Sequence, residues 1–236
     1  VVFLATIYSN FKFVAVAGVN AFIMLRCTTP LLVSVMDWVF LGRQLPKTQS
    51  LFALLGIFVS GTFYASLKVQ ESEGASSHLV SQEVFLWAAV WLSSFIVDMI
   101  YIKHVVDTYD CSALERTLYQ NAFAIPFLLL LATSPLETTA IFDMFSGSTV
   151  KGQVALFLSC IAGTALSFTG MTLRSELSAT VFTVLGIVCK MASSLLSELF
   201  VEQEKSWHVL MCIFLSITSS AFYRQAPLRK DMNVGS

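Results

Sequence analysis

Hydrophobic residues in this chain run in stretches of helix length that short polar segments separate. A membrane-crossing helix needs about 20 apolar residues, because each residue adds about 1.5 Å to a path of about 30 Å. The pattern therefore predicts an all-α membrane protein, folded as a polytopic helical bundle. The predicted spans are 18–41, 49–68, 84–105, 113–133, 152–172, 177–200 and 206–223, after a remnant of an earlier span at 1–11.

Composition narrows the class of protein. The chain is 56% hydrophobic and 12% charged, with a mean hydropathy of +0.76, which is far too apolar for an ordinary soluble domain. Its five cysteines are scattered, without a CxxC pair or a histidine cluster at metal spacing. The sequence has no Ser/His/Asp arrangement, HExxH motif or glycine-rich phosphate loop. We expect a protein of the lipid bilayer that is no enzyme and has no cofactor, metal or nucleic-acid partner.

Charge in the connections predicts the orientation of the spans. Short connections are basic and longer ones are acidic, and short loops rich in Lys and Arg stay in the cytosol. Some lysines, such as Lys68 and Lys151, fall on the opposite side and weaken the bias. We expect residues 1–224 to form a single transmembrane domain and 225–236 a cytosolic tail. The basic segments are 42–47, 173–176 and the tail with Arg224, Arg229 and Lys230.

The first two full spans resemble the last two in layout. Each pair opens with a helix that carries a basic residue near mid-depth and an acid near its end. The offset is about 160 residues, or five spans, and an odd number of spans reverses the second copy, as in an inverted repeat. A five-helix repeat implies ten helices in the intact protein. Because Val1 already lies in an apolar stretch, we expect an N-terminal truncation that removes the first two helices and part of the third.

The two basic residues near mid-depth are Arg26 and Lys190. A charge at the bilayer centre costs roughly 3 kcal/mol, so it is kept mostly where a cavity, a partner or a substrate compensates for it. Two cations without an obvious acid at the same depth indicate a binding site for an anion, as in a transporter. Gly186 lies one helical turn before Lys190, on the same face, and leaves room for a ligand beside the amine.

Both cations also have a purely structural interpretation. Lys190 could form an ion pair with an acid of another span, such as Asp98. The guanidinium of Arg26 could bind backbone carbonyls that Pro30 frees, because proline donates no hydrogen bond to the preceding turn.

A third polar group is the run Leu118-Tyr119-Gln120-Asn121, in the first half of span 113–133. Tyrosine offers an aromatic face, and the two amides offer donors and acceptors of the kind that can read the edge of a nucleobase. Polar residues are also common near membrane interfaces, so the run alone is a weak signal.

Acids and small residues have simpler expected roles. Asp37 and Glu198 lie near the ends of their spans, where we expect water to solvate them. Asp98 is expected to pair with the basic end at Lys103 and His104, with a proton site as the alternative. Small residues at four-residue spacing favour close helix packing, with self-association as a homodimer the alternative. They are Ala155, Ser159, Gly163 and Ser167 in one span and Gly56 and Ser60 in another.

Several of these segments together resemble the nucleotide-sugar transporters of the GDP-mannose branch. Residues 177–190 are similar to that family's Gly-Ala-Leu-Asn-Lys region, a box that here reads Gly-Ile-Val-Cys-Lys and ends at Lys190. Leu118-Tyr119-Gln120-Asn121 resembles the second signature, Phe-Tyr-Asn-Asn or Leu-Tyr-Asn-Asn. Residues 101–106 and 22–42, the latter with Arg26, are similar to the corresponding stretches of the family.

The resemblance covers nearly the whole chain and implies a drug/metabolite-transporter fold of two inverted five-helix repeats, located in Golgi membranes with both termini cytosolic. It implies exchange of a nucleotide sugar, GDP-mannose or a related GDP-sugar, for a nucleoside monophosphate. By the same resemblance Tyr119 and Asn121 contact the guanine, Gly186 lines the ribose and sugar, and Lys190 attracts the phosphates.

Two positions depart from the family pattern. Gln120 and Cys189 each replace an asparagine, so one amide is lengthened and the other is lost. The identity of the base and sugar is therefore open, and the phosphate site is less affected. Alternatives are a UDP-sugar or sugar-phosphate carrier and, from another class, a non-transporting membrane scaffold or degenerate fragment.

Overall fold

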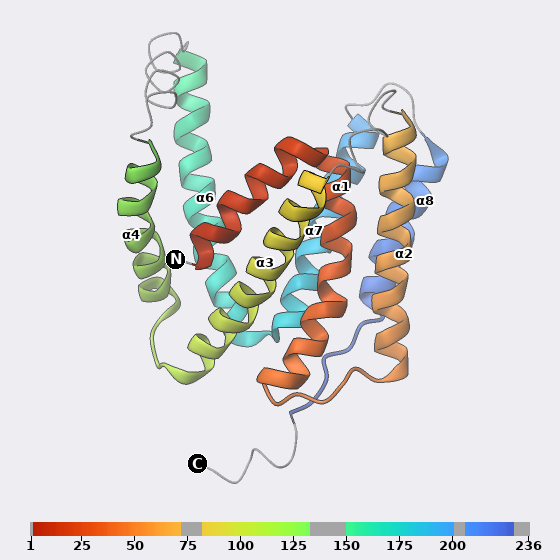
Figure 1. Ribbon diagram of the computed structural model, residues 1–236, viewed down its shortest axis with the longest axis horizontal. Coiled ribbons are helices and arrows are strands. Elements are labelled where there is room, and N and C mark those ends of the chain that lie inside the picture. The colour runs from red at the N-terminus through yellow and green to blue at the C-terminus, as the bar shows by residue number, and fades with distance from the viewer. Residues whose placement is uncertain (1, 72–81, 133–149, 201–205, 229–236) are drawn as a thin grey trace. The chain divides into compact units, whose positions relative to one another are not determined.

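The structure, a computed structural model, describes residues 2–71, 82–132, 150–200 and 206–228, most of which form helices (Figure 1). Every extended regular element in these ranges is an α-helix, which confirms the expected all-α membrane fold. The helices are α1 (Val2–Phe40), α2 (Thr48–Glu71), α3 (Gln82–Thr108), α4 (Ala113–Ala132), α6 (Val150–Glu176), α7 (Ala179–Phe200) and α8 (Trp207–Ala221).

Six helical stretches in these ranges are long and apolar enough to cross a membrane. One of them, Val2–Val19, corrects the expected remnant at 1–11, because the helix continues through the polar residues Asn10 and Lys12. The amine of Lys12 lies 5.7 Å from the ring centre of Tyr8. The other five are Ala21–Phe40, Thr48–Lys68, Gln82–Thr108, Val150–Glu176 and Ala179–Phe200.

The helices α4 and α8 form where spans 113–133 and 206–223 are predicted, but neither is among these six. The first turns of α4 carry Glu115 and Arg116, which lower its apolar character. The helix α8 is apolar and has 15 residues, so at about 1.5 Å per residue it is about 22 Å long.

The described residues belong to two compact units. In the unit of residues 106–176, α4 packs against α6. A capping box starts α4: the backbone N–H of Ser112 donates to Glu115 at 2.8 Å, and the backbone N–H of Glu115 donates to the Ser112 hydroxyl oxygen at 3.2 Å. Arg116 donates to the carbonyl oxygens of Val106 and Tyr109, which ties α4 to the end of α3.

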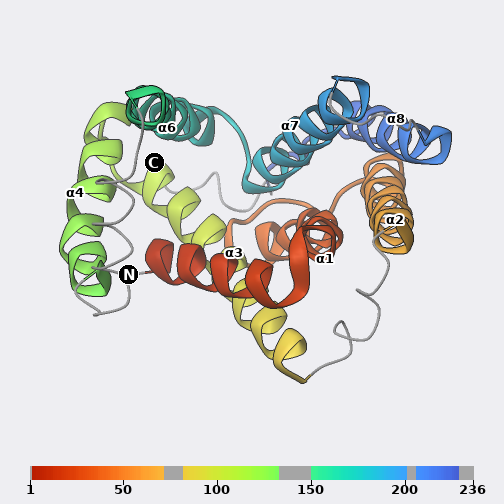
Figure 2. The same cartoon turned by 90° about the horizontal axis from the view of Figure 1, so that it is seen from above.

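The second unit contains residues 2–105 and the chain from 177 onward. Its main core lies where α1, α2, α7 and α8 meet (Figure 2). The helix α2 packs on α8, and α1 packs on α7. In the expected inverted repeat, α1 corresponds to α7 and α2 corresponds to α8. The helices of each corresponding pair are in contact with each other. The buried core residues are Ile23, Cys27, Leu54, Ile57, Tyr64, Val184, Ile187, Met191, Val209 and Ile213.

A kink divides α1 at Gly18, whose backbone has φ 80° and ψ 167°. That region is essentially restricted to glycine. In a straight helix, Phe13 and Phe22 would lie about 13 Å apart along the axis. The kink instead brings their ring centres to 6.4 Å, and Phe13 stacks on Trp91 of α3 at 6.4 Å.

Glycines allow two close helix contacts in this unit. A Cβ atom at Gly56 would lie 3.0 Å from the Cβ atom of Ser219 in α8, and one at Gly61 would lie 2.6 Å from that of Cys27 in α1. Ser60, the partner of Gly56 in the predicted small-residue face, is 1% exposed. Close packing is therefore confirmed for α2. In α6, a Cβ at Gly163 would meet no atom within 4 Å, so the role of its small-residue stripe stays a prediction.

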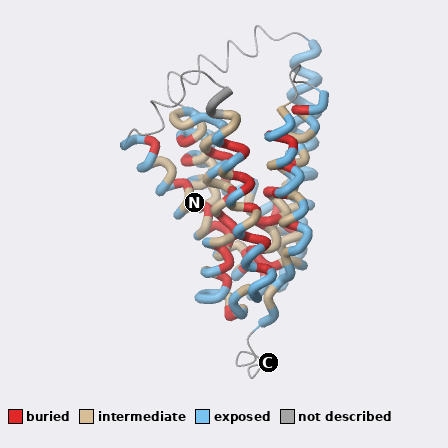
Figure 3. Tube along the Cα trace, turned by 90° about the vertical axis from the view of Figure 1, so that its right-hand side faces the viewer, coloured by how far each residue is buried: buried red, intermediate tan, exposed pale blue. Residues whose placement is uncertain are grey.

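Buried positions recur along the helices with exposed ones between them (Figure 3).

At the end of α1, the connection to α2 runs beside the chain that follows α8. The Gln44 N–H donates to the Pro227 oxygen at 3.0 Å, the Arg43 guanidinium donates to the Ala226 oxygen at 3.1 Å, and the Ser50 hydroxyl donates to the Arg224 oxygen at 3.0 Å. Two of the three basic segments therefore lie together at one end of the unit.

Candidate functional site

The two mid-depth cations come from neighbouring helices of one unit, Arg26 from α1 and Lys190 from α7. The two helices are joined at one end by Asp37 and Thr180. Lys190 lies about 15 Å from this contact along α7, and Arg26 lies about 16 Å from it along α1. Both residues therefore lie at a similar distance from this contact along their helices, and their mid-depth position in a membrane stays a prediction.

Aromatic rings surround the two cations. The amine of Lys190 lies 4.3 Å from the ring centre of Phe22. The guanidinium carbon of Arg26 lies 6.0 Å from the same ring centre and 5.3 Å from that of Phe95 in α3. We refer to Arg26, Lys190, Phe22 and Phe95 as the cation–aromatic cluster. Among the described residues, no ion pair neutralises either cation.

The structure does not bear out the two structural alternatives. The carbonyl oxygen of Arg26, freed by Pro30, accepts a hydrogen bond from the Thr29 hydroxyl at 2.7 Å. Within the described part of the chain, Lys190 forms no ion pair with Asp98. Asp98 itself is 4% exposed and makes other interactions, so its expected ion pair stays a prediction.

Gly186 lies beside Arg26 across the contact between α1 and α7. A Cβ at this position would lie 3.4 Å from the Nη2 atom of Arg26. The guanidinium of Arg26 therefore lies against the face of α7 that has no side chain at Gly186. Cys189 precedes Lys190 and is exposed. Three of the predicted residues, Arg26, Gly186 and Lys190, are therefore brought together.

Tyr119, Gln120 and Asn121 lie on α4, in the other unit. The side chain of Tyr119 is 58% exposed, and its ring is nearly parallel to that of Phe123, with the ring centres 6.4 Å apart. The Asn121 amide donates to the carbonyl oxygen of Thr117 at 2.9 Å, and Gln120 is half-buried. The phenol ring is thus available for stacking, while one hydrogen of the Asn121 amide is engaged within the helix.

The prediction that Asp37 is solvated is wrong, because this side chain is only 3% exposed. Its Oδ2 atom accepts hydrogen bonds from the Thr180 backbone N–H at 3.1 Å and from the Thr180 hydroxyl at 2.5 Å. The start of α7 therefore takes the place of water. Tyr223, which follows α8, lines the same small polar pocket.

The same prediction is wrong for Glu198, which is 1% exposed. It forms an ion pair with Lys68 near the end of α2. Among the described residues, its two carboxylate oxygens have no hydrogen-bond partner besides this contact. Proximity to a helix end did not reveal the neighbouring helix that covers each acid.

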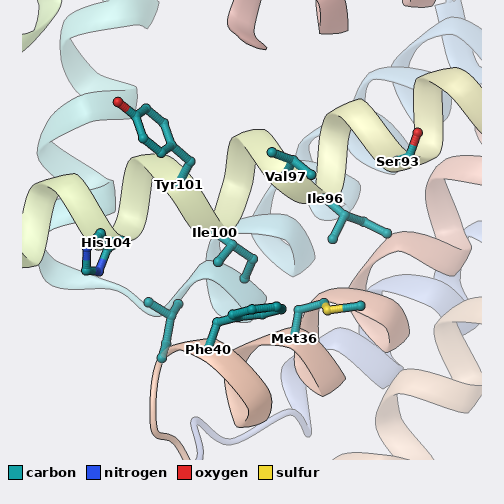
Figure 4. A pocket seen from close by; sticks show the side chains of 9 residues that line it. Met36, Phe40, Ser93, Ile96, Val97, Ile100, Tyr101 and His104 are labelled. Carbon is teal, nitrogen blue, oxygen red and sulfur yellow. The ribbon is translucent and has the colours of Figure 1, made fainter.

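A separate apolar groove of about 620 Å³ lies between α1 and α3. Figure 4 shows Met36 and Phe40 on one side and Ile96 and Ile100 on the other. Its few polar side chains include Ser93 and His104, and none of the predicted site residues lines it. The groove has no signal in the sequence, because its lining is typical of an ordinary apolar helix surface.

The helices and the cation–aromatic cluster define an all-α, multi-pass membrane protein with an unneutralised pair of cations in the described part of its interior. No family model matches the chain. Two transporters of Arabidopsis thaliana align with nearly all of it. The "GDP-mannose transporter GONST3" is 28% identical over 233 residues, which cover 97% of this chain and 60% of that protein. The "GDP-fucose transporter 1" is 26% identical over 233 residues, which cover 96% of this chain and 65% of that protein.

The chain is thus similar over nearly its whole length to two proteins named as GDP-sugar transporters, in agreement with the resemblance seen in its motifs. It spans 60–65% of the length of these two proteins. Both are named as transporters and neither as an enzyme, in agreement with the absence of a catalytic motif.

Proposed function

We propose that the protein transports a nucleotide sugar across a membrane, with GDP-mannose or a related GDP-sugar as its substrate and GMP as the exchanged product. The observation that carries the proposal is that two cations, Arg26 and Lys190, lie at the same Phe22 ring without an acidic partner in the described residues. A diphosphate supplies the negative charge that this pair lacks. The names of the two relatives support a GDP-sugar over other anions.

The roles of the site residues follow from their chemistry. Lys190 and Arg26 attract the phosphates, because an opposite charge beside a cation is strongly favoured in an environment of low dielectric constant. By the resemblance of its motif, Gly186 lines the ribose and sugar. The assignment of the base to Tyr119, by stacking, and to Asn121, by hydrogen bonds to the base edge, rests on the resemblance of their motif alone.

Exchange follows from the same electrostatics. Transport proceeds by alternating access, in which two repeats of five helices rock about a central site. When the site is empty, its two cations repel each other, and turning the empty site across the membrane is costly. A bound nucleotide sugar or monophosphate lowers this cost, so that each outward movement of one ligand is coupled to the inward movement of another.

Gln120 and Cys189 leave the identity of the base and of the sugar open. Each takes the place of an asparagine in the resembling motifs, so a UDP-sugar or sugar-phosphate carrier remains the competing assignment, and a non-transporting scaffold is a third. Uptake by proteoliposomes of the full-length protein, loaded with GMP or with UMP, separates these alternatives. GMP-dependent uptake of GDP-mannose supports the proposal, and UMP-dependent uptake of UDP-sugars assigns the substrate class to UDP-sugars. If neither substrate is taken up, the result favours the scaffold.

For the location, we propose a Golgi membrane with the C-terminus in the cytosol. The basic segments that contain Arg43 and Arg224 lie at the same end of their unit, as the positive-inside rule requires of loops on one side. A protease-protection assay on sealed Golgi vesicles with a C-terminal epitope tag tests this orientation. Digestion of the tag without detergent is expected, and protection of the tag contradicts it.

A further inference from the structure

One phenylalanine ring is shared by both cations of the cation–aromatic cluster. The ring centre of Phe22 lies 4.3 Å from the Lys190 amine and 6.0 Å from the guanidinium carbon of Arg26. Phe95 provides a second ring for Arg26 at 5.3 Å. These distances are within the range in which the negative face of an aromatic ring attracts a cation.

The two rings are held in place by their own neighbours. Phe22 meets Trp91 edge-on at 5.0 Å, and Phe95 stacks on Trp91 at 5.3 Å. Phe13 completes the group by stacking on Trp91. All four rings are 1–6% exposed. The rings therefore have a fixed orientation, set by the packing of α1 on α3 and by the kink at Gly18.

Aromatic rings can hold these two like-charged side chains in place without neutralising their charge. Arg26 and Lys190 carry the same charge and form no ion pair within the described residues. Without a partner, each long side chain would sample several rotamers, and ligand binding would have to order it. Aromatic faces attract a cation without neutralising it, so the positive field that draws an anion is preserved.

We propose that Phe22 is a positioning residue of the anion site: its ring orders Arg26 and Lys190 in the empty site, so that both cations face an arriving phosphate group. The proposal deepens the proposed function, on which it rests for the identity of the anion. Phe95 fixes the second side of Arg26. Phe22 itself touches no substrate and acts through the two cations.

The experiment replaces Phe22 in the full-length protein with 3,4,5-trifluorophenylalanine. This residue closely matches phenylalanine in shape but has little negative charge on the ring face. The matched control is the same replacement at Phe13, which is 2% exposed and packs in the same ring group but is in contact with neither cation. Equilibrium binding of labelled GMP and GDP-mannose is measured on the purified protein.

A desolvated cation–aromatic contact corresponds to a change of about tenfold in affinity or more. We expect fluorinated Phe22 to bind GMP and GDP-mannose about tenfold more weakly, and fluorinated Phe13 to bind them within about twofold of the wild type. Unchanged affinity with fluorinated Phe22 overturns the proposal. An equal loss with fluorinated Phe13 also overturns it, because packing alone then explains the effect.

A second measurement needs no nucleotide and separates this proposal from the proposed function. Reductive methylation with ¹³C-formaldehyde labels lysine amines, and a neighbouring ring face shifts the methyl resonance upfield. An upfield Lys190 resonance that is lost in Phe22→Leu and kept in Phe13→Leu supports the contact even if neither nucleotide binds the wild type. A Lys190 resonance at the position of an exposed lysine overturns it, whatever the protein transports.

Discussion

Replacing Gly18 with alanine isolates the contribution of one backbone conformation to the stability of α1. The backbone of Gly18 has φ 80° and ψ 167°, and a Cβ atom there would have no neighbour within 4 Å. A steric clash with other side chains is therefore excluded as a cause, and only the backbone conformation opposes the substitution. A non-glycine residue held in this region costs about 1–3 kcal/mol.

The matched control is Gly163→Ala in α6. A Cβ at Gly163 also has no neighbour within 4 Å, but this glycine lies inside a helix with ordinary dihedral angles. Alanine is favoured over glycine in a helix by about 1 kcal/mol, so this variant is expected to equal or exceed the wild type in stability. The two substitutions are chemically identical and differ in the backbone conformation that alanine must adopt.

The assay is unfolding in mixed detergent micelles, with the free energy of unfolding followed by tryptophan fluorescence. We expect Gly18→Ala to lose about 1–3 kcal/mol, or to straighten α1 and separate Phe13 from Phe22. In the second case, the fluorescence of Trp91, which is 1% exposed in the kinked structure, changes before unfolding begins. A Gly18→Ala protein with the stability and native fluorescence of the wild type would refute the kink.

Three further predictions concern contacts in the same unit, and the same unfolding assay tests each. Lys68→Met is expected to lower the free energy of unfolding by about 3–5 kcal/mol, because it leaves Glu198 buried without its partner. Adding Glu198→Leu should recover most of this loss, and a double variant as unstable as the single one contradicts the ion pair. Gly61→Ala is expected to cost about 1–3 kcal/mol because its Cβ collides with Cys27, and wild-type stability of this variant would rule out the close approach. Thr180→Val removes a hydroxyl donor from a buried carboxylate and is expected to cost about 1.5–3 kcal/mol, whereas a loss below about 0.5 kcal/mol argues against that hydrogen bond.

Helix positions were largely predictable because apolar runs of about 20 residues are a direct consequence of bilayer thickness. The stretches 49–68 and 177–200 fall within two residues of the spans that the structure gives, Thr48–Lys68 and Ala179–Phe200. The first helix was underestimated because Asn10 and Lys12 interrupt its apolar run, although an isolated polar residue does not end a helix. The kink at Gly18 has no local sequence signal beyond the glycine itself.

The cations were identified from sequence because a charge within an apolar run stands out at once. The rings around them were missed, although the spacing of Phe22 and Arg26 places both on one helical face and offered a partial signal. Phe95 belongs to another helix, and only the tertiary fold brings it to Arg26. The burial of Asp37 and Glu198 was mispredicted for the same reason, since their covering partners lie on distant segments.

The central claim is that the cation pair at mid-depth binds the phosphates of a transported nucleotide sugar. The most direct test compares uptake of labelled GDP-mannose by GMP-loaded proteoliposomes that contain the full-length wild type, Lys190→Ala, or Lys151→Ala, an exposed lysine outside the cluster. Loss of a charged contact with a buried partner predicts a decrease of about 100-fold for Lys190→Ala, with Lys151→Ala unchanged. GMP-dependent uptake by Lys190→Ala at the wild-type rate would contradict the account.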